Sequence, residues 1–240
     1  MHATMAGALQ AQLASGRRAV AILLAAGLLL SGPVWLGATA VADEVERANK
    51  KTLASAFRPK SEAVPAGGRP AATRGLTIKS KTRGLVRNMI WPVAPAGVGL
   101  TADPSPVLYW YSTGRIAGPA YLRIEADGAK DPILDVTLLD GAEPGLNAAD
   151  LGVYGLKLQP QQDYKWYLTL APLAGEGEPA DTVGGKVRFV PARSDDAREL
   201  AASGYWYDTF HAVSGDSEAV VIMLDQADLH DLAQKLRGAS

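Results

Sequence analysis

The sequence predicts a mainly β protein, an antiparallel β-sandwich of about seven strands with α-helices at its C-terminal end. Two observations carry this prediction: short runs in which apolar and polar residues alternate, and clusters of turn residues between those runs. Alternation with a period of two is typical of strands that bury one face. Because no helical pattern separates these runs, we expect antiparallel pairing.

The predicted sandwich domain covers residues 84–192. Its clearest strand is 120–127, in which Ala, Leu, Ile and Ala share one side and Tyr, Arg, Glu and Asp share the other. The glycines at 184 and 185 predict a hairpin turn before the last strand. The other predicted strands are residues 85–91, 107–111, 134–138, 153–158, 165–170 and 186–189.

Residues 158–166 read Leu-x-Pro-x-x-x-Tyr-x-Trp. This motif resembles the tyrosine corner of immunoglobulin-like sandwiches, where a Tyr hydroxyl bonds to the backbone a few residues upstream. We therefore expect an immunoglobulin-like sandwich whose corner consists of Leu158, Pro160, Tyr164 and Trp166. The alternative is an incidental tyrosine after a proline turn.

Residues 1–42 have the layout of a secretory signal peptide: Arg17-Arg18, an apolar run over 19–30, and small residues before Ala40 and Ala42. We favour cleavage after Ala42, which predicts a periplasmic or secreted protein. The absence of cysteine is consistent with an oxidising compartment. The alternative is an uncleaved membrane anchor, since residues 19–42 are uncharged and roughly 20 residues suffice to span a bilayer.

Residues 43–83 predict a disordered linker, because large apolar residues are scarce and Ala, Pro, Gly, Lys and Arg dominate. Residues 1–99 contain 13 basic and 4 acidic residues, against 11 and 21 in 100–240. We favour a solvated linker, because no amphipathic period or interleaved aromatic residues accompany the charge. The alternative is peripheral contact of this basic segment with an anionic membrane surface. Export makes nucleic acid an improbable partner.

Residues 193–240 predict a helical segment. Ser194 is the expected N-cap of its first helix, with Asp195 and Asp196 in the first turn. Further helices are expected over residues 205–213 and 217–236, whose apolar spacing suits packing on the sandwich.

The chain offers little for catalysis. It has no cysteine and three histidines, and no nucleophile or metal motif accompanies Asp208 and His211, which a helix would place on one face. We expect an exposed, structural His211 and no catalytic, metal or cofactor site. A run of possible cation ligands is expected to be a solvated acidic face: Asp225, Asp228, His230 and Asp231.

Aromatic residues suggest a binding surface. If Trp110 faces the core, Tyr109 and Tyr111 face outward beside Tyr167, where they could stack on sugar rings or anchor a protein. We favour the alternative, in which these tyrosines pack beneath the C-terminal helices, because those helices need an apolar surface to pack on.

Five short motifs follow one another along the chain: Thr73-Arg74-Gly75, Gly99-Leu100-Thr101, Pro104 to Tyr111, Leu158 to Leu170, and Gly204-Tyr205-Trp206-Tyr207-Asp208. Their order over residues 73–210 is similar to that in an uncharacterised bacterial family catalogued as domain of unknown function 928. The resemblance implies an exported protein with a sandwich fold. It implies no known activity and no catalytic residues.

These patterns favour an exported, non-catalytic module that binds an envelope protein or polysaccharide. The alternative hypothesis is a periplasmic hydrolase or lyase that uses carboxylates alone, with Asp135, Asp140 or Asp208 as its catalytic group.

Processing is the first testable prediction. N-terminal sequencing of the exported protein should begin at Asp43 or Val41, because small residues precede both bonds. Recovery of the full-length chain from the membrane fraction would support the anchor instead.

Overall fold

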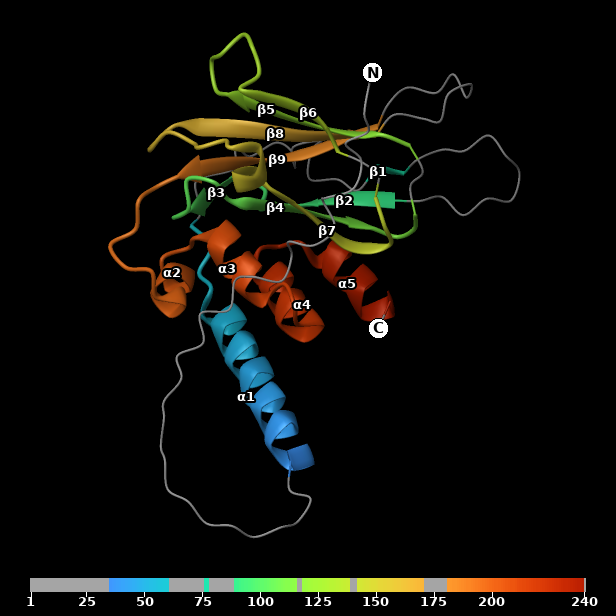
Figure 1. Ribbon diagram of the computed structural model, residues 1–240, viewed down its shortest axis with the longest axis vertical. Coiled ribbons are helices and arrows are strands. Elements are labelled where there is room, and N and C mark those ends of the chain that lie inside the picture. The colour runs from blue at the N-terminus through green and yellow to red at the C-terminus, as the bar shows by residue number, and fades with distance from the viewer. Residues whose placement is uncertain are drawn as a thin grey trace, which may run out of the picture. The chain divides into compact units, whose positions relative to one another are not determined.

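Figure 1 shows the computed structural model of the protein. The described residues are 35–60, 76–77, 89–115, 118–138, 142–170 and 181–239. The chain divides into two units, Met1–Thr39 and Ala40–Ser240. The second unit contains both β-sheets and the C-terminal helices.

The described strands form two sheets. Sheet A has the order β1-β2-β4-β7, and sheet B has the order β3-β9-β8-β5-β6. The strands pair antiparallel except β3 and β9, which are parallel, so the expectation of purely antiparallel pairing is wrong at this edge. The bounds are β1 (Leu76–Thr77), β2 (Met89–Val93), β3 (Val98–Thr101), β4 (Val107–Ser112), β5 (Ala120–Ala126), β6 (Leu134–Leu138), β7 (Gly145–Asp150), β8 (Asp163–Leu170) and β9 (Asp181–Phe189).

The strands predicted at 107–111, 120–127, 134–138 and 165–170 correspond to β4, β5, β6 and β8, and the one predicted at 186–189 is the end of β9. Strands β3 and β7 were not predicted. The strand predicted at 153–158 is wrong, because Leu151–Tyr154 form the 3-10 helix η2. The Asp150 side chain caps this helix, and Gly155 ends it in the left-handed conformation with a φ of 68°. The hairpin predicted at residues 184 and 185 is also wrong, since both lie inside β9.

The C-terminal segment is helical as predicted, with two local differences. The first helix is capped by Asp196, which accepts from two backbone N–H groups, and Ser194 instead accepts from the Asp196 N–H. The run predicted at 217–236 splits into two helices because Asp228 adopts a positive φ of 58°. The helices are α2 (Ala197–Ala202), α3 (Trp206–Val213), α4 (Ser217–Gln226) and α5 (His230–Ala239).

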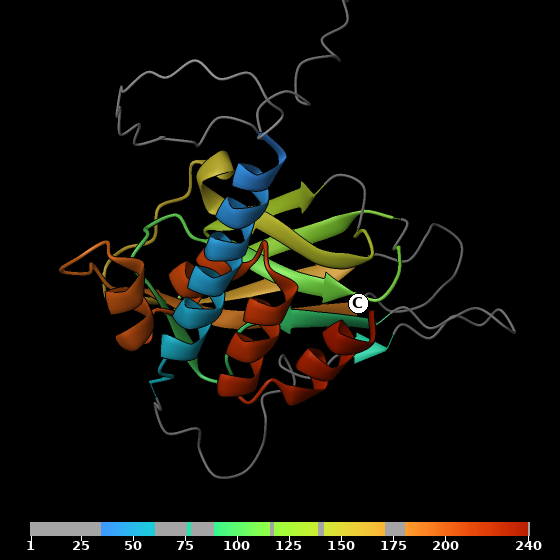
Figure 2. The same ribbon diagram turned by 90° about the horizontal axis from the view of Figure 1, so that it is seen from below.

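The C-terminal helices cover the face of sheet A that points away from sheet B (Figures 1 and 2). Phe210 of α3 packs on Tyr109 of β4 with 5.0 Å between ring centroids. Lys235 Nζ of α5 lies 6.0 Å from the ring centroid of Trp91 on β2. Strands β2 and β4 of sheet A are therefore buried on both faces, whereas the described helices leave the outer face of sheet B uncovered.

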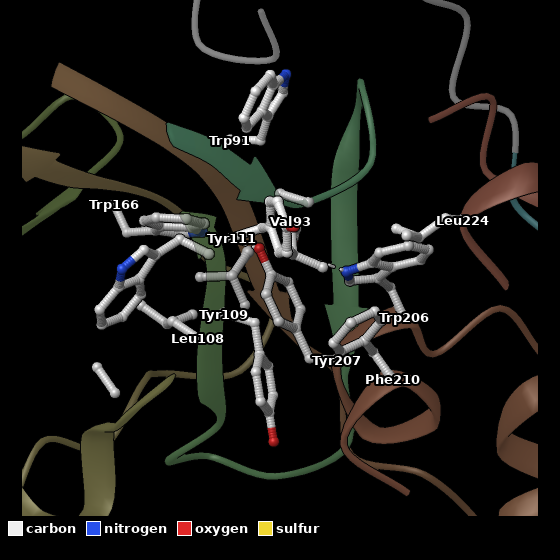
Figure 3. Close-up of a cluster of buried hydrophobic side chains, with 14 of the residues drawn as sticks. Trp91, Val93, Leu108, Tyr109, Tyr111, Trp166, Trp206, Tyr207, Phe210 and Leu224 are labelled. Atoms are coloured by element: carbon white, nitrogen blue, oxygen red, sulfur yellow. Dashed lines mark hydrogen bonds between the residues drawn. The ribbon is translucent and has the colours of Figure 1, made fainter. Parts of the chain in front are cut away.

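An aromatic cluster joins the helices to the two sheets (Figure 3). The indole N–H of Trp166 donates to Tyr207 Oη at 2.9 Å, and that hydroxyl donates to the Lys186 carbonyl at 3.0 Å. The indole N–H of Trp206 lies 3.4 Å from the Val93 carbonyl. These bonds satisfy the polar atoms of large buried rings.

The prediction of a disordered linker from residue 43 is wrong for its first part. Helix α1 (Trp35–Ala56) continues through this segment, and Leu53, Ala54 and Phe57 belong to the hydrophobic core. Phe57 meets Trp206 edge to face, with 5.5 Å between ring centroids. Composition indicated disorder because few apolar residues are present, but Leu53 and Ala54 in the last turn of α1 and Phe57 just after it all reach the core. Residues 61–75 and 78–83 of the predicted linker lie outside the described residues.

Most of the predicted signal peptide also lies outside the described residues, and both predicted cleavage positions, Ala40 and Ala42, fall within α1. In the part of the chain that the structure describes, no helix combines the length and apolar character needed to span a bilayer.

The tyrosine-corner residues lie at the start of β8. Tyr164 is buried, and its hydroxyl accepts a hydrogen bond from the Gln159 N–H at 2.9 Å, five residues upstream. Leu158 and Trp166 are buried beside it, whereas Pro160 is exposed and bridges to Phe189. This geometry is the one expected of a tyrosine corner.

Replacing Tyr164 should therefore destabilise the domain. We expect Tyr164→Phe to lower the free energy of unfolding by about 1 kcal/mol or more, because the Gln159 N–H loses its acceptor. Tyr167→Phe, on the opposite face of β8, should change it by less than about 0.5 kcal/mol. Urea unfolding of both variants provides the comparison, and equal losses would contradict the corner assignment.

The packing of α1 gives a second stability prediction. Phe57→Ala should lower the free energy of unfolding by about 3 kcal/mol, because a ring that is 2% exposed leaves a cavity against Trp206. Val45→Ala, in the same segment at a side chain that is 55% exposed, should cost less than about 0.5 kcal/mol. Thermal or urea melts that do not separate the two variants would show that α1 is not part of the folded core.

Candidate functional site

The predicted surface of Tyr109 and Tyr111 does not exist. Both rings are buried, at 6% and 5% exposure. They point toward the helical layer, where Tyr109 packs on Phe210 and Tyr111 lies beside Trp91 with 6.1 Å between ring centroids (Figure 3). The alternation along β4 was predicted correctly, and the face that carries Tyr109 packs beneath α3, as the favoured interpretation expected.

Tyr167 lies on the uncovered face of sheet B, as predicted, and Tyr121 joins it there. Tyr121 pairs with Thr169 and Arg123 pairs with Tyr167, so the two tyrosines are diagonal neighbours on adjacent strands β5 and β8. Tyr121 is 38% exposed and Tyr167 is partly exposed. We call the surface formed by Tyr121, Arg123, Tyr167 and Thr169 the outer face. Its second tyrosine could have been found from the period-two pattern of residues 120–127.

Gly184 leaves one side of Tyr167 open, because it is the residue opposite Tyr167 on β9. A Cβ at position 184 would lie 2.1 Å from the Trp166 carbonyl oxygen. No side chain fits at this position, so glycine is required by close backbone approach. The Tyr167 ring consequently has no cross-strand side chain on that flank.

Charged side chains around the outer face form two ion pairs, and the exposed Lys186 lies opposite Lys165 on β9. Lys165 Nζ lies 2.8 Å from Asp127, and this bond lowers the pKa of the carboxyl and raises that of the amine. Arg123 Nε donates to Glu125 at 2.7 Å. The tyrosines therefore lie among mutually neutralised ion pairs, which can offer hydrogen bonds to hydroxyl groups without selecting a strongly charged ligand.

A second feature is an open hollow of about 570 Å³ between the β3–β4 loop, the segment before α2 and the start of α3. Asp103, Arg193, Asp195 and Asp208 contribute to its walls. Burial raises the pKa of Asp208, and the nearby Asp103 acts in the same direction. Asp208 Oδ2 accepts from the Ala102 N–H at 2.9 Å, which opposes that shift and ties α3 to the loop.

The structure separates the other residues considered for chemistry. His211 is exposed, as predicted, but its Nδ1 lies 2.6 Å from Tyr109 Oη and not beside Asp208. Asp135 is exposed and lies 3.7 Å from Arg123, and Asp140 lies outside the described residues.

The acidic run near the C-terminus is engaged in ion pairs. Asp225 contacts Arg237 and lies 3.2 Å from His230 Nδ1, while Asp228 and Asp231 are exposed. Among the described residues, no group of three or more His, Asp or Glu is placed to hold a metal ion.

The second unit is thus a mainly β domain in which helices cover one sheet and leave a tyrosine-bearing face on the other. A family model described as Domain of Unknown Function (DUF928) matches residues 69–234, more than half of the chain, and the protein belongs to this family. No curated protein matches the sequence. The family match includes sheet B and the helices α2 to α4, and it begins after α1.

The raised pKa of Asp208 makes stability depend on pH. A carboxyl whose pKa is higher in the folded state stabilises the fold most below its ordinary pKa, near 3.8, and this contribution is lost as pH rises through the folded value. Asp208→Asn keeps an oxygen for the Ala102 N–H but cannot ionise. We expect the variant to gain stability relative to the natural protein between pH 4 and pH 7 in urea melts, and a constant difference would contradict the burial of this carboxylate.

Proposed function

We propose that the protein is an exported, non-catalytic module that binds an envelope polysaccharide through the outer face. One observation carries the proposal: Tyr121 and Tyr167 lie as diagonal neighbours on two central strands of a sheet that no described helix covers. Flat aromatic rings on a rigid sheet can stack on the apolar faces of sugars, and the surrounding ion pairs can bond to their hydroxyl groups.

The export of the protein is part of this proposal and is supported by the sequence. The basic pair, apolar run and small residues of 1–42 have the layout of a signal peptide, and the chain contains no cysteine. An envelope polysaccharide is a ligand that such a protein would meet after export.

We also infer that the two sheets form an immunoglobulin-like sandwich. Strand β8, which carries Tyr164, lies between β5 and β9, as the F strand of that fold lies between C and G. Strand β4 lies between β2 and β7, as B lies between A and E. The strand order and the tyrosine corner thus support the same assignment.

Co-sedimentation with purified cell-wall sacculi tests the binding proposal. Tyr167→Ala and Tyr121→Ala should each weaken binding by about fivefold or more, because a central aromatic contact contributes more than about 1 kcal/mol. Tyr154→Ala is a matched control, since Tyr154 is 37% exposed and lies on η2, away from the outer face. Equal binding by all three variants and the natural protein would refute the outer face as the binding surface.

A carboxylate-dependent hydrolase or lyase is the second candidate function. Asp208 favours it, because a carboxyl with a raised pKa beside Asp103 in an open hollow could act as a general acid. Its bond to the Ala102 N–H supports a structural role equally well. Loss of glycan cleavage in Asp208→Asn with its fold retained would favour catalysis over binding alone.

A further inference from the structure

Strand β6 is a free edge of sheet B. Among the described residues its strand partner is β5 alone. The opposite edge, β3, is different: α3 packs beside it, and Asp208 of α3 binds the backbone of Ala102 just after it. One edge of sheet B is thus covered by a helix, whereas no described element covers the other.

Two of the three inward-facing side chains of β6, Leu134 and Val136, are only partly buried, whereas Leu138 is buried. On β5, Leu122 and Ile124 are 1% and 0% exposed. Their cross-strand partners on β6, Val136 and Leu134, are only partly buried, and Ile133 just before the strand is 41% exposed. The hydrophobic core is therefore incompletely covered at this edge, and another strand paired with β6 could bury the apolar surface that remains.

This edge lacks several of the features that prevent strands from pairing. Lysine, proline and glycine are absent from Leu134–Leu138. The one charge, Asp135, points to the outer face and lies 3.7 Å from Arg123 of the same sheet. A strand added at β6 would meet no unpaired charge.

We propose that two copies of this chain associate weakly through β6, in an antiparallel pair centred on Val136. A two-fold axis through this residue places Leu134 opposite Leu138 and Asp135 opposite Thr137, so apolar side chains meet on the inner face and no like charges meet on the outer face. Centring the pair on Asp135 would place two carboxylates opposite each other. The sequence of β6 is thus complementary to itself in the Val136 register, which favours a second copy over another partner.

The pairing extends sheet B across the two copies. Tyr121 of β5 lies opposite Thr137 of β6, so the outer faces of the two chains would adjoin on one continuous sheet. Association through β6 does not depend on the proposed ligand, but it would present two tyrosine pairs to the same polymer and raise apparent affinity by avidity. A five-residue strand buries little area, so we expect a dimer that forms with rising concentration.

Disulfide trapping tests the register, because the natural chain has no cysteine. In the proposed pair the two Val136 side chains are opposite each other, within reach of a disulfide after small adjustment. Val136→Cys should form a covalent dimer under mild oxidation at least about tenfold faster than Val153→Cys, a matched control at a side chain that is 76% exposed on η2. Thr137→Cys, opposite Asp135 in this register, should be slower than Val136→Cys.

Sedimentation velocity over a concentration series tests whether the chains associate without a disulfide between them. The natural protein should shift from one chain toward two as concentration rises, and Val136→Lys should stay monomeric because an inward-pointing charge blocks edge pairing. Val153→Lys controls for the added charge, and a urea melt of each variant checks its fold. A monomer at all concentrations, a dimer unaffected by Val136→Lys, or Val136→Cys oxidation no faster than the control would each overturn the proposal. A protein that dimerises but does not bind sugar would contradict the proposed function of the outer face and leave the dimer proposal standing.

Discussion

The contact between Trp166 and Tyr207 is the constraint on which the rest of the structure depends. It joins the interior of sheet B to α3 through a buried hydrogen bond of 2.9 Å. Burial raises the pKa of Tyr207, so its hydroxyl keeps the proton that it donates to the Lys186 carbonyl. Space for the two rings depends on glycine: a Cβ at Gly99 would lie 2.7 Å from the Tyr207 ring, and one at Gly185 would lie 3.0 Å from the Trp166 indole nitrogen.

Docking of α3 at this contact decides which sheet faces solvent. Once Tyr207 is inserted, Phe210 of the same helix lies against Tyr109, and strands β2 and β4 are enclosed between sheet B and the helices. The outer face of sheet B then carries the exposed tyrosines. The binding surface therefore follows from the position of a helix that contributes no residue to it.

Helix α1 extends the helical layer beyond the family match. Phe57, just after its last turn, packs against Trp206, and Gln226 of α4 donates to the Ser55 carbonyl at 3.2 Å. Two of its basic residues take part in ion pairs, Lys50 with Glu46 at 2.9 Å and Lys51 with Glu218. Both lysines thus lie beside carboxylates, and Glu218 of α4 offsets one positive charge that α1 could present to a membrane surface.

The sequence by itself determined those elements that depend on a pattern of neighbouring residues. Alternation placed β5 and β6, the Leu-x-Pro-x-x-x-Tyr-x-Trp motif located the Tyr164 hydroxyl bond, and apolar spacing located α3. Only the tertiary structure decided which strand faces are buried, because the sequence alternates in the same way whether the tyrosines of a strand face water or a helix. Tyr109 and Tyr167 show this, because each is next in sequence to a buried tryptophan that points to the other face of its strand. Helix α3, distant in sequence, covers Tyr109 but not Tyr167.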